Sequence, residues 1–169
     1  GGDLAVTGQD QLLISLLKPE RLLEMVRLYT LFDKKAGKIV ARYQQIFGIK
    51  RLIERISTKN SKGGREGGVI WHTTGSGKSF TMVFLSKALI LHEALKQCRI
   101  LVVTDRVDLE DQLSKTFVSG GELAGKKDKQ NAMATSGKRL AEQIGKGTER
   151  IMFSLIQKFN SATKLPECV

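Results

Sequence analysis

The sequence predicts an α/β domain built around a parallel sheet. Three short apolar runs lie at 69–71, 100–104 and 151–153, each of a length suited to a buried strand. Segments with helical periodicity lie between these runs, so strands and helices alternate along the chain, as they do in parallel sheets. Three strands make a thin sheet, and we expect further strands beyond Val169.

Length and composition bound the class of protein. The chain has 169 residues, enough for one compact domain, and its 41% hydrophobic and 27% charged residues exclude a disordered chain. No apolar run approaches the roughly 18 residues that span a bilayer, so no membrane partner is expected. Cys98 and Cys168 stand far apart without metal-site spacing, which favours reduced intracellular thiols.

The charge balance points to a polyanionic partner. Lys and Arg number 28 against 17 Asp and Glu, a net charge of +11. An excess of this size in a small domain favours nucleic acid. The alternative is that the compensating acidic part of the protein lies outside this chain.

The first half of the chain is predicted to be helical. Apolar spacing predicts helices over 9–29, interrupted at Pro19, which suits the first turn of a second helix. Residues 30–40 are interpreted as a connector, and 57–68 as a polar, flexible loop. Between them the spacing predicts a helix over 42–57, with one apolar face formed by Ile46, Ile49, Ile53 and Ile56.

The second half alternates strands and helices. The predicted order is strand 69–71, helix 78–95, strand 100–104, helix 107–117, helix 136–145 and strand 151–153. Ser136 is the expected N-cap of its helix. Residues 118–135, which carry glycines and lysines, are expected to be loose.

A glycine-rich loop joins the first strand to the next helix. It reads His72-Thr73-Thr74-Gly75-Ser76-Gly77-Lys78-Ser79 and matches the phosphate-loop pattern GxxxxGK[ST] except at its first position. The two glycines let the backbone approach phosphates, and the loop amides form a nest for anionic oxygens. Lys78 supplies a charge for the β- and γ-phosphates, and Ser79 is the expected Mg²⁺ ligand.

The alternative for this loop is a glycine-rich turn that caps an ordinary helix. The predicted strand before it and amphipathic helix after it favour nucleotide binding instead. His72 stays open between a contact to the nucleotide or a neighbouring motif and a satisfied histidine at a strand end, the interpretation that we favour.

The amino-acid sequence of this loop resembles motif I of the motor (R) subunit of type I restriction enzymes, which are superfamily-two translocases. Residues 42–45 resemble the upstream Q-motif, and 102–113 resemble motif Ia, with its Asp-Arg-x-x-Leu-x-x-Gln pattern. Residues 151–159 resemble the strand and turn before motif II. With the lead-in at 16–23 and 29–33, the resemblance covers nearly the whole chain.

The resemblance implies a fold and a domain division. We expect a three-layer, RecA-like P-loop NTPase with a partial parallel sheet, preceded by N-terminal helices. Residues 1–40 would be a helical lead-in from a nuclease domain, and 41–169 part of the first motor domain. A cytoplasmic prokaryotic protein is implied.

The cofactors expected are ATP and Mg²⁺. By the resemblance Gln45 reads adenine, and its amide carries the donor and acceptor that the N6 and N7 edge requires; an exposed helix glutamine is the alternative. Catalysis is assigned to Lys78 and Ser79, with Ser79 on the metal. Nucleotide contacts are assigned to Gln45, Thr73, Thr74, Gly75, Ser76, Gly77, Lys78, Ser79 and Phe80.

Three residues are candidates for contact with double-stranded DNA. Arg106 follows a strand at the edge where open α/β sheets bind ligands, and Gln157 and Lys158 follow another. The alternative for each is a solvated loop residue. The chain has Ser154-Leu155 where the family usually has Thr-Thr, which weakens the expectation of a contact there.

Motifs that hydrolysis needs are missing from the sequence. No Asp-Glu pair occurs that could serve as motif II, and no second motor domain supplies an arginine finger. We therefore expect this chain to be part of a larger subunit, to bind nucleotide weakly and to hydrolyse it negligibly alone. The parent would act with specificity and methyltransferase subunits. The alternatives are another superfamily-two helicase or a non-motor nucleotide-binding module.

Overall fold

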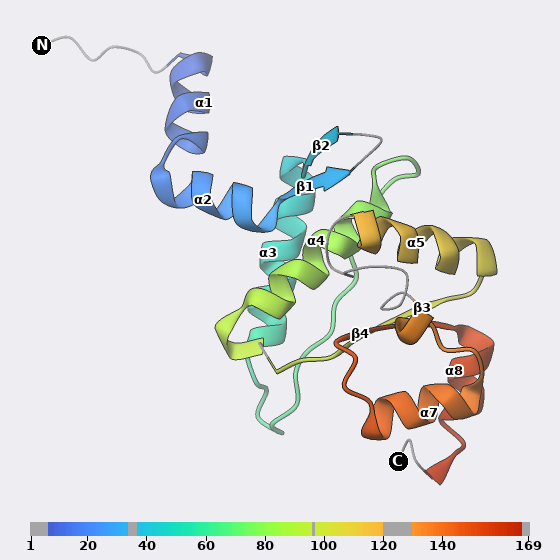
Figure 1. Ribbon diagram of the computed structural model, residues 1–169. Helices are drawn as coiled ribbons and strands as arrows, with labels where there is room; N and C mark the ends of the chain where they lie inside the picture. The colour runs from blue at the N-terminus through green and yellow to red at the C-terminus, as the bar shows by residue number, and fades with distance from the viewer. Residues whose placement is uncertain (1–6, 34–36, 96, 120–129, 167–169) are drawn as a thin grey trace, which may run out of the picture.

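The computed structural model describes residues 7–33, 37–95, 97–119 and 130–166 and shows an α/β protein with two small sheets (Figure 1). The N-terminal elements are α1 (Gly8–Leu16), α2 (Pro19–Leu28), β1 (Thr30–Asp33), β2 (Gly37–Val40) and α3 (Tyr43–Ser57). They are followed by α4 (Lys78–Leu91), the 3₁₀ turn η1 (Glu93–Leu95), β3 (Ile100–Thr104), α5 (Val107–Ser119), α7 (Gly137–Lys146), β4 (Ile151–Leu155) and α8 (Ile156–Ala162).

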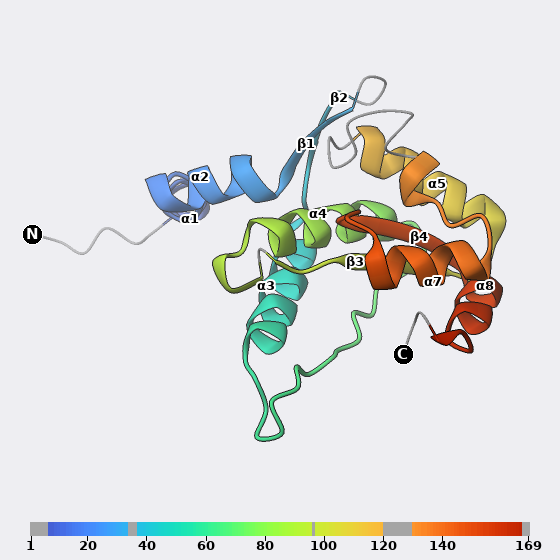
Figure 2. The same ribbon diagram turned by 60° about the horizontal axis from the view of Figure 1, so that its bottom comes forward.

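The predicted parallel pairing is confirmed for β3 and β4. Their register runs from Ile100 opposite Ile151 to Thr104 opposite Leu155, so both carboxyl ends reach the same edge. β4 extends two residues past the predicted run 151–153 and passes directly into α8. Helices cover both faces of the pair: α5 lies on one side and α7 and α8 on the other (Figures 1 and 2).

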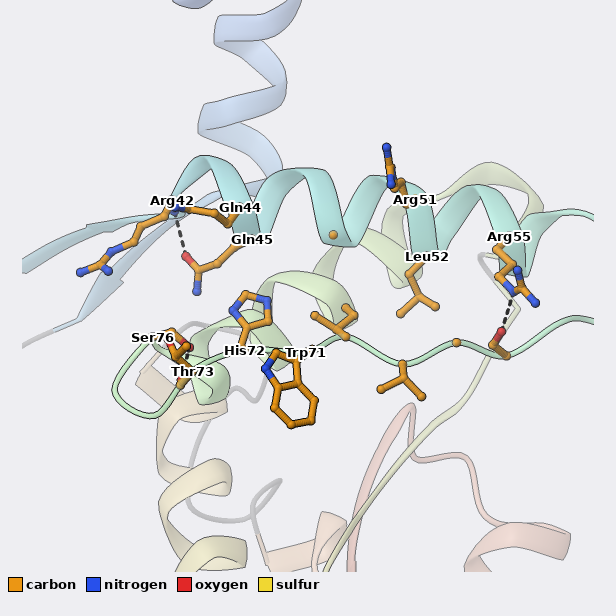
Figure 3. A pocket seen from close by; sticks show the side chains of 15 residues that line it. Arg42, Gln44, Gln45, Arg51, Leu52, Arg55, Trp71, His72, Thr73 and Ser76 are labelled. Carbon is orange, nitrogen blue, oxygen red and sulfur yellow. Dashed lines mark hydrogen bonds between the residues drawn. The ribbon is translucent and has the colours of Figure 1, made fainter.

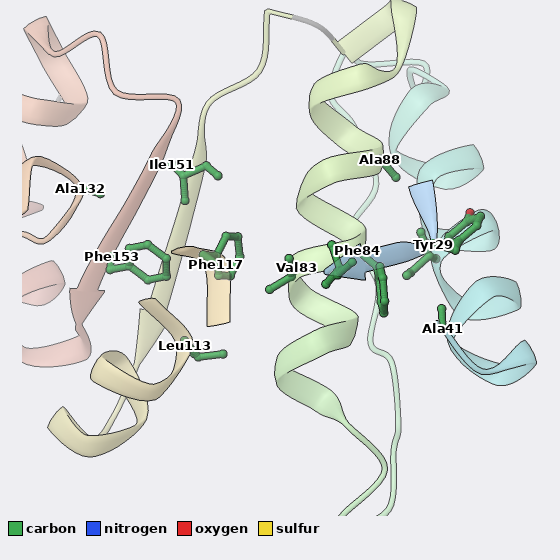
Figure 4. Packing of buried hydrophobic residues seen from close by; sticks show 12 residues of the cluster. Tyr29, Ala41, Val83, Phe84, Ala88, Leu113, Phe117, Ala132, Ile151 and Phe153 are labelled. Carbon is green, nitrogen blue, oxygen red and sulfur yellow. The ribbon is translucent and has the colours of Figure 1, made fainter. Parts of the chain in front are cut away.

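The main core joins the two strands to α4 and the N-terminal hairpin. The Phe117 ring of α5 meets Phe153 of β4 edge-on, with centroids 5.2 Å apart. Phe84 of α4 faces Tyr29 with centroids 6.5 Å apart, and Val83 lies between the two groups (Figure 4). Each buried aromatic or aliphatic side chain of this kind contributes about 1.5–3 kcal/mol, so α4 is fixed at the centre of the domain.

A second apolar cluster lies under α7 and α8, where Leu140, Ala141 and Ala162 are buried. The predicted N-cap is confirmed, since the Ser136 hydroxyl accepts a hydrogen bond of 3.1 Å from the Arg139 amide. Of the predicted loose segment 118–135, the first two residues continue α5, and 120–129 lie outside the described residues.

The prediction of a buried strand over 69–71 is wrong for the described structure. The segment is extended but belongs to no strand, and Val69 and Trp71 are 92% and 90% exposed. Only Ile70 turns inward, toward Gly48 of α3. A strand needs a neighbour for its backbone hydrogen bonds, and within the described residues no other strand pairs with this segment.

Two predicted loops have more structure than expected. The connector 30–40 contains an antiparallel hairpin in which Thr30 of β1 pairs with Val40 of β2. The loop 57–68 closes as a hydrogen-bonded turn: the Asn60 carboxamide oxygen accepts from two loop amides, and the Arg65 guanidinium donates to the Ile56 and Ser57 carbonyls. Arg65 thus satisfies carbonyls that the end of α3 leaves without partners.

The N-terminal helices form where the periodicity predicts them. Thr7 caps α1 in a reciprocal pair with Asp10, and Pro19 opens α2. α1 extends away from the rest of the domain (Figures 1 and 2), whereas Met25 and Leu28 of α2 pack against the main core. Apolar side chains such as Leu13 and Leu23 are exposed. Among the described helices, none has the length and apolar character needed to cross a membrane.

Candidate functional site

The glycine-rich loop adopts the backbone shape that its glycines predict. Gly75 has a φ of 76° and Gly77 a φ of 82°, both in the left-handed region that residues with a Cβ rarely enter. Gly77 is also the N-cap of α4. The chain therefore reverses at Gly75 and enters the helix at Lys78 without strain.

The N-terminus of α4 is suited to an anion. No side chain caps it, so the first-turn amides have no acceptor within the helix, and the helix dipole adds partial positive charge there. Lys78 is exposed, while Ser79 and Phe80 are half-buried. The Phe80 ring packs against the main core, which leaves its backbone as the part available to a ligand.

A single carbonyl organises the side chains of this loop. The Thr73 carbonyl accepts from the Lys78 ammonium at 2.8 Å, from the Ser76 hydroxyl at 2.7 Å and from the Ser76 amide at 3.3 Å. The ammonium is therefore held over the loop by a neutral acceptor. An anionic oxygen is a stronger partner for it than a carbonyl, so a phosphate group would compete well for this charge.

Gln45 connects α3 to the loop. Its side chain is 5% exposed. Its amide nitrogen donates to the Thr81 hydroxyl at 2.8 Å and to the Gly77 carbonyl at 3.2 Å, while its oxygen accepts from the Arg42 amide at 2.8 Å. Both N–H groups are thus engaged within the protein, and the oxygen keeps one free lone pair. The alternative of an exposed helix glutamine does not describe this residue.

A cleft of about 750 Å³ lies beside the loop, between α3 and the extended segment 67–73 (Figure 3). The Arg55 guanidinium holds the segment against α3 by donating to the Gly67 carbonyl at 2.6 Å and pairing with Glu66 at 2.9 Å. The cleft is lined by Arg42, Gln44, Gln45, Gly48, Arg51, Leu52, Arg55, Gly67, Gly68, Val69, Ile70, Trp71, His72, Thr73 and Ser76.

His72 lies in this cleft and not at a strand end, because no strand forms before it. Its side chain is half-buried and points into the space between α3 and the loop (Figure 3). Trp71 is next to it and is exposed. The structure therefore adds polar and aromatic surface at the side of the phosphate loop.

Arg106 and Gln157 lie beyond the carboxyl ends of adjacent parallel strands. Arg106 follows β3, and Gln157 is in the first turn of α8 after β4; both are exposed. The Arg106 guanidinium contacts both oxygens of the Asp108 carboxylate, at 2.6 and 3.1 Å. Because this pair is open to solvent, it is weak and leaves the guanidinium accessible.

Lys158 is directed into the protein, unlike the other two candidates for DNA contact. Its ammonium donates to the Ala134 carbonyl at 2.8 Å and lies 3.9 Å from the Glu110 carboxylate. Glu110 is buried, and burial raises the pKa of its carboxyl, an effect that Lys158 opposes and Asp111 reinforces. Sequence reasoning singled out neither Glu110 nor Thr81, because each is a single polar residue on a helix without a pattern of its own.

The metal-ligating capacity of the described residues is small. Within the part of the chain that the structure describes, no group of three His, Cys, Asp or Glu side chains could hold a metal ion. The Ser79 hydroxyl in the first turn of α4 is the candidate ligand. Mg²⁺ is commonly bound through one or two protein groups together with substrate phosphates and water, and the loop fits that mode.

Comparison with known proteins gives one ATPase family and several similar restriction-enzyme subunits. The family described as SWI2/SNF2 ATPase matches residues 44–168. The chain is similar to a type I restriction enzyme HindI endonuclease subunit of Haemophilus influenzae, with 39% identity over 88% of the chain and 14% of the relative. It is also similar to a putative type I restriction enzyme MjaIXP endonuclease subunit of Methanocaldococcus jannaschii, with 33% identity over 94% of the chain and 15% of the relative. The chain thus spans about one seventh of the length of these relatives.

Proposed function

The chain belongs to the SWI2/SNF2 ATPase family, and from this premise we propose that it is the ATP-binding part of the motor subunit of a type I restriction endonuclease. The observation that carries the proposal is the uncapped N-terminus of α4 behind Gly75 and Gly77, with the Lys78 ammonium beside it. This arrangement is an anion site ready for a triphosphate. The relatives named above support the restriction system as its setting.

Binding of ATP would use the loop in a defined way. The amides of 73–80 would face the phosphates, and Lys78 would leave the Thr73 carbonyl for the β- and γ-oxygens. Ser79 would hold Mg²⁺, which neutralises phosphate charge when bound. The adenine would lie in the neighbouring cleft, where the free lone pair of the Gln45 oxygen can accept from an exocyclic amino group.

The proposed fold is part of a RecA-like motor domain over 41–169, with 1–40 as a helical lead-in. Helices on both faces of β3 and β4 support a three-layer arrangement. The segment 69–71 has the alternation of an unpaired strand, with Val69 and Trp71 exposed and Ile70 inward. In the complete subunit we expect it to pair with further strands of this sheet.

The proposed partners are double-stranded DNA and the specificity and methyltransferase subunits of the restriction complex. Arg106 and Gln157 are the proposed contacts to the DNA backbone, since both are exposed beyond the carboxyl ends of neighbouring strands. In the parent protein, ATP hydrolysis would drive translocation along duplex DNA, and cleavage would follow.

The test is Lys78→Ala, measured by titration calorimetry with ATP and Mg²⁺. We expect at least tenfold weaker binding, about 1.4 kcal/mol, because the loop loses its ammonium. Lys138→Ala removes one charge at an exposed site on α7 and should leave the affinity unchanged within about twofold. A loss below tenfold for Lys78→Ala would show that the phosphates bind elsewhere, and ATP binding without salt-dependent DNA binding would favour a non-motor module.

A further inference from the structure

We propose that Lys158 and Glu110 form an internal link that positions α8 against α5, in place of a contact between Lys158 and DNA. This inference rests on the proposed function, because the proposed DNA contacts are Arg106, which immediately precedes α5, and Gln157, which belongs to α8. The link makes Glu110 and Lys158 positioning residues, which act on the DNA-facing edge without touching it.

The Lys158 ammonium joins three segments of the chain. It belongs to α8, donates to the Ala134 carbonyl at 2.8 Å and faces Glu110 of α5 at 3.9 Å. Ala134 is itself bound to β4, since its amide donates to the Phe153 carbonyl at 3.0 Å. The side chain of Lys158 is 27% exposed, and its charged end is directed toward these internal acceptors.

The buried carboxylate of Glu110 explains why the Lys158 ammonium is directed into the protein. The residue is 2% exposed, and one carboxylate oxygen has no hydrogen-bond partner among the described residues. Among the described residues, Lys158 is the cation that pairs with this carboxylate. If the ammonium swung outward to a DNA phosphate, it would leave a buried carboxylate without compensation, which is strongly unfavourable.

The link lies directly behind the proposed DNA edge. Arg106 is four residues before Glu110, and its carbonyl accepts the Glu110 amide at 3.0 Å in the first turn of α5. Gln157 is next to Lys158 in the first turn of α8. The strands that feed the two helices are in register, with Thr104 opposite Leu155. Fixing Glu110 to Lys158 therefore fixes the spacing between the two exposed side chains.

The first experiment is a double-mutant cycle on the free energy of unfolding, with Lys158→Met, Glu110→Gln and the double variant in urea at pH 8. We expect Lys158→Met to raise the unfolding equilibrium constant at least tenfold more in the wild-type background than in the Glu110→Gln background. The reason is that the amide introduced by Glu110→Gln carries no charge that needs the ammonium. A difference below about threefold would overturn the link.

The second experiment distinguishes a positioning role of Lys158 from a direct contact between Lys158 and DNA. The affinity for a duplex oligonucleotide is measured over a series of salt concentrations for Lys158→Met, Glu110→Gln and Arg106→Gln. Loss of one phosphate contact lowers the salt slope by about 1, and we expect this for Arg106→Gln. Lys158→Met and Glu110→Gln should both weaken binding with the slope unchanged.

A slope reduced by about 1 in Lys158→Met, with normal binding by Glu110→Gln, would overturn the inference. It would show that Lys158 contacts a phosphate. If the wild-type chain showed no salt-dependent binding, the proposed DNA contact would fail by itself, and the unfolding cycle would still decide whether the link exists.

Discussion

Replacing Gln45 by alanine tests whether this residue supports the phosphate loop. The change removes three hydrogen bonds: those from the side-chain nitrogen to the Thr81 hydroxyl and the Gly77 carbonyl, and that from the Arg42 amide to the side-chain oxygen. All three bonds join α3 to the start of α4 or close the first turn of α3. The change therefore acts on the site that the loop forms.

The expected loss in the free energy of unfolding depends on which hydrogen bonds the partners of Gln45 keep in the variant. A typical hydrogen bond contributes about 1 kcal/mol net, and more where a buried partner is left unsatisfied. The Gly77 carbonyl keeps the Thr81 amide at 3.0 Å, and the exposed N-terminus of α3 admits water to the Arg42 amide. We therefore expect a loss of about 2–3 kcal/mol in the free energy of unfolding.

The measurement is urea denaturation followed by circular dichroism, paired with ATP titration. Gln44→Ala is the matched control for the unfolding measurement, because Gln44 is the exposed neighbour on the same helix, and its loss should lower the free energy of unfolding by no more than about 0.5 kcal/mol. ATP affinity should fall with stability in the Gln45 variant, since the loop loses its support. A loss in the free energy of unfolding equal to that of Gln44→Ala would refute the proposal that Gln45 supports the phosphate loop.

Two further predictions concern the second half of the chain. A Cβ at Gly137 would lie 2.6 Å from the Ser161 Cβ, so Gly137→Ala should lower the free energy of unfolding in thermal denaturation by about 1–3 kcal/mol. Gly145→Ala, at an exposed site on the same helix, should raise it by about 0.5–1 kcal/mol. Equal changes in stability for the two variants would contradict the close packing at Gly137. Burial raises the pKa of Glu110 above its ordinary value of 4.5, so the carboxyl favours folding at low pH and loses this contribution as pH rises through its folded pKa. Urea titrations above pH 4.5 should show the wild type losing stability relative to Glu110→Gln, and parallel curves would contradict this.

Local patterns predicted the elements that depend on local chemistry. The helix over 42–57, the strand at 100–104 and the cap at Ser136 follow from periodicity, β-branching and a side-chain acceptor, and each is confirmed. The loop glycines also take the backbone angles that their type allows. In these places the signal and its structural consequence lie within a few residues of each other.

The remaining features depend on contacts between distant parts of the chain. The run at 69–71 has strand composition, but a strand also needs a neighbour, and none pairs with it among the described residues. Gln45 and Thr81 meet across 36 positions of sequence. Their sequence contexts are those of ordinary helix residues, so no local pattern could have revealed the bond.

The net charge of +11 overstates the cationic surface available to a nucleic acid. The Arg99 guanidinium donates to the carbonyls of Gln143 and Ile144 in the last turns of α7 and to that of Glu149 in the following loop. Lys158 is held by the Ala134 carbonyl beside Glu110. Such cations complete helix ends or compensate buried charge, and moving them to DNA would leave those groups unsatisfied.

Exposure and partners therefore decide which basic residues can contribute to binding. Arg106 meets the criterion, because its carboxylate partner Asp108 is as open to solvent as the guanidinium itself, with side-chain exposures of 68% and 69%. A phosphate can replace such a partner at little cost. The salt dependence of DNA binding should thus reflect exposed residues of this kind and fall well short of the 28 basic side chains in the sequence.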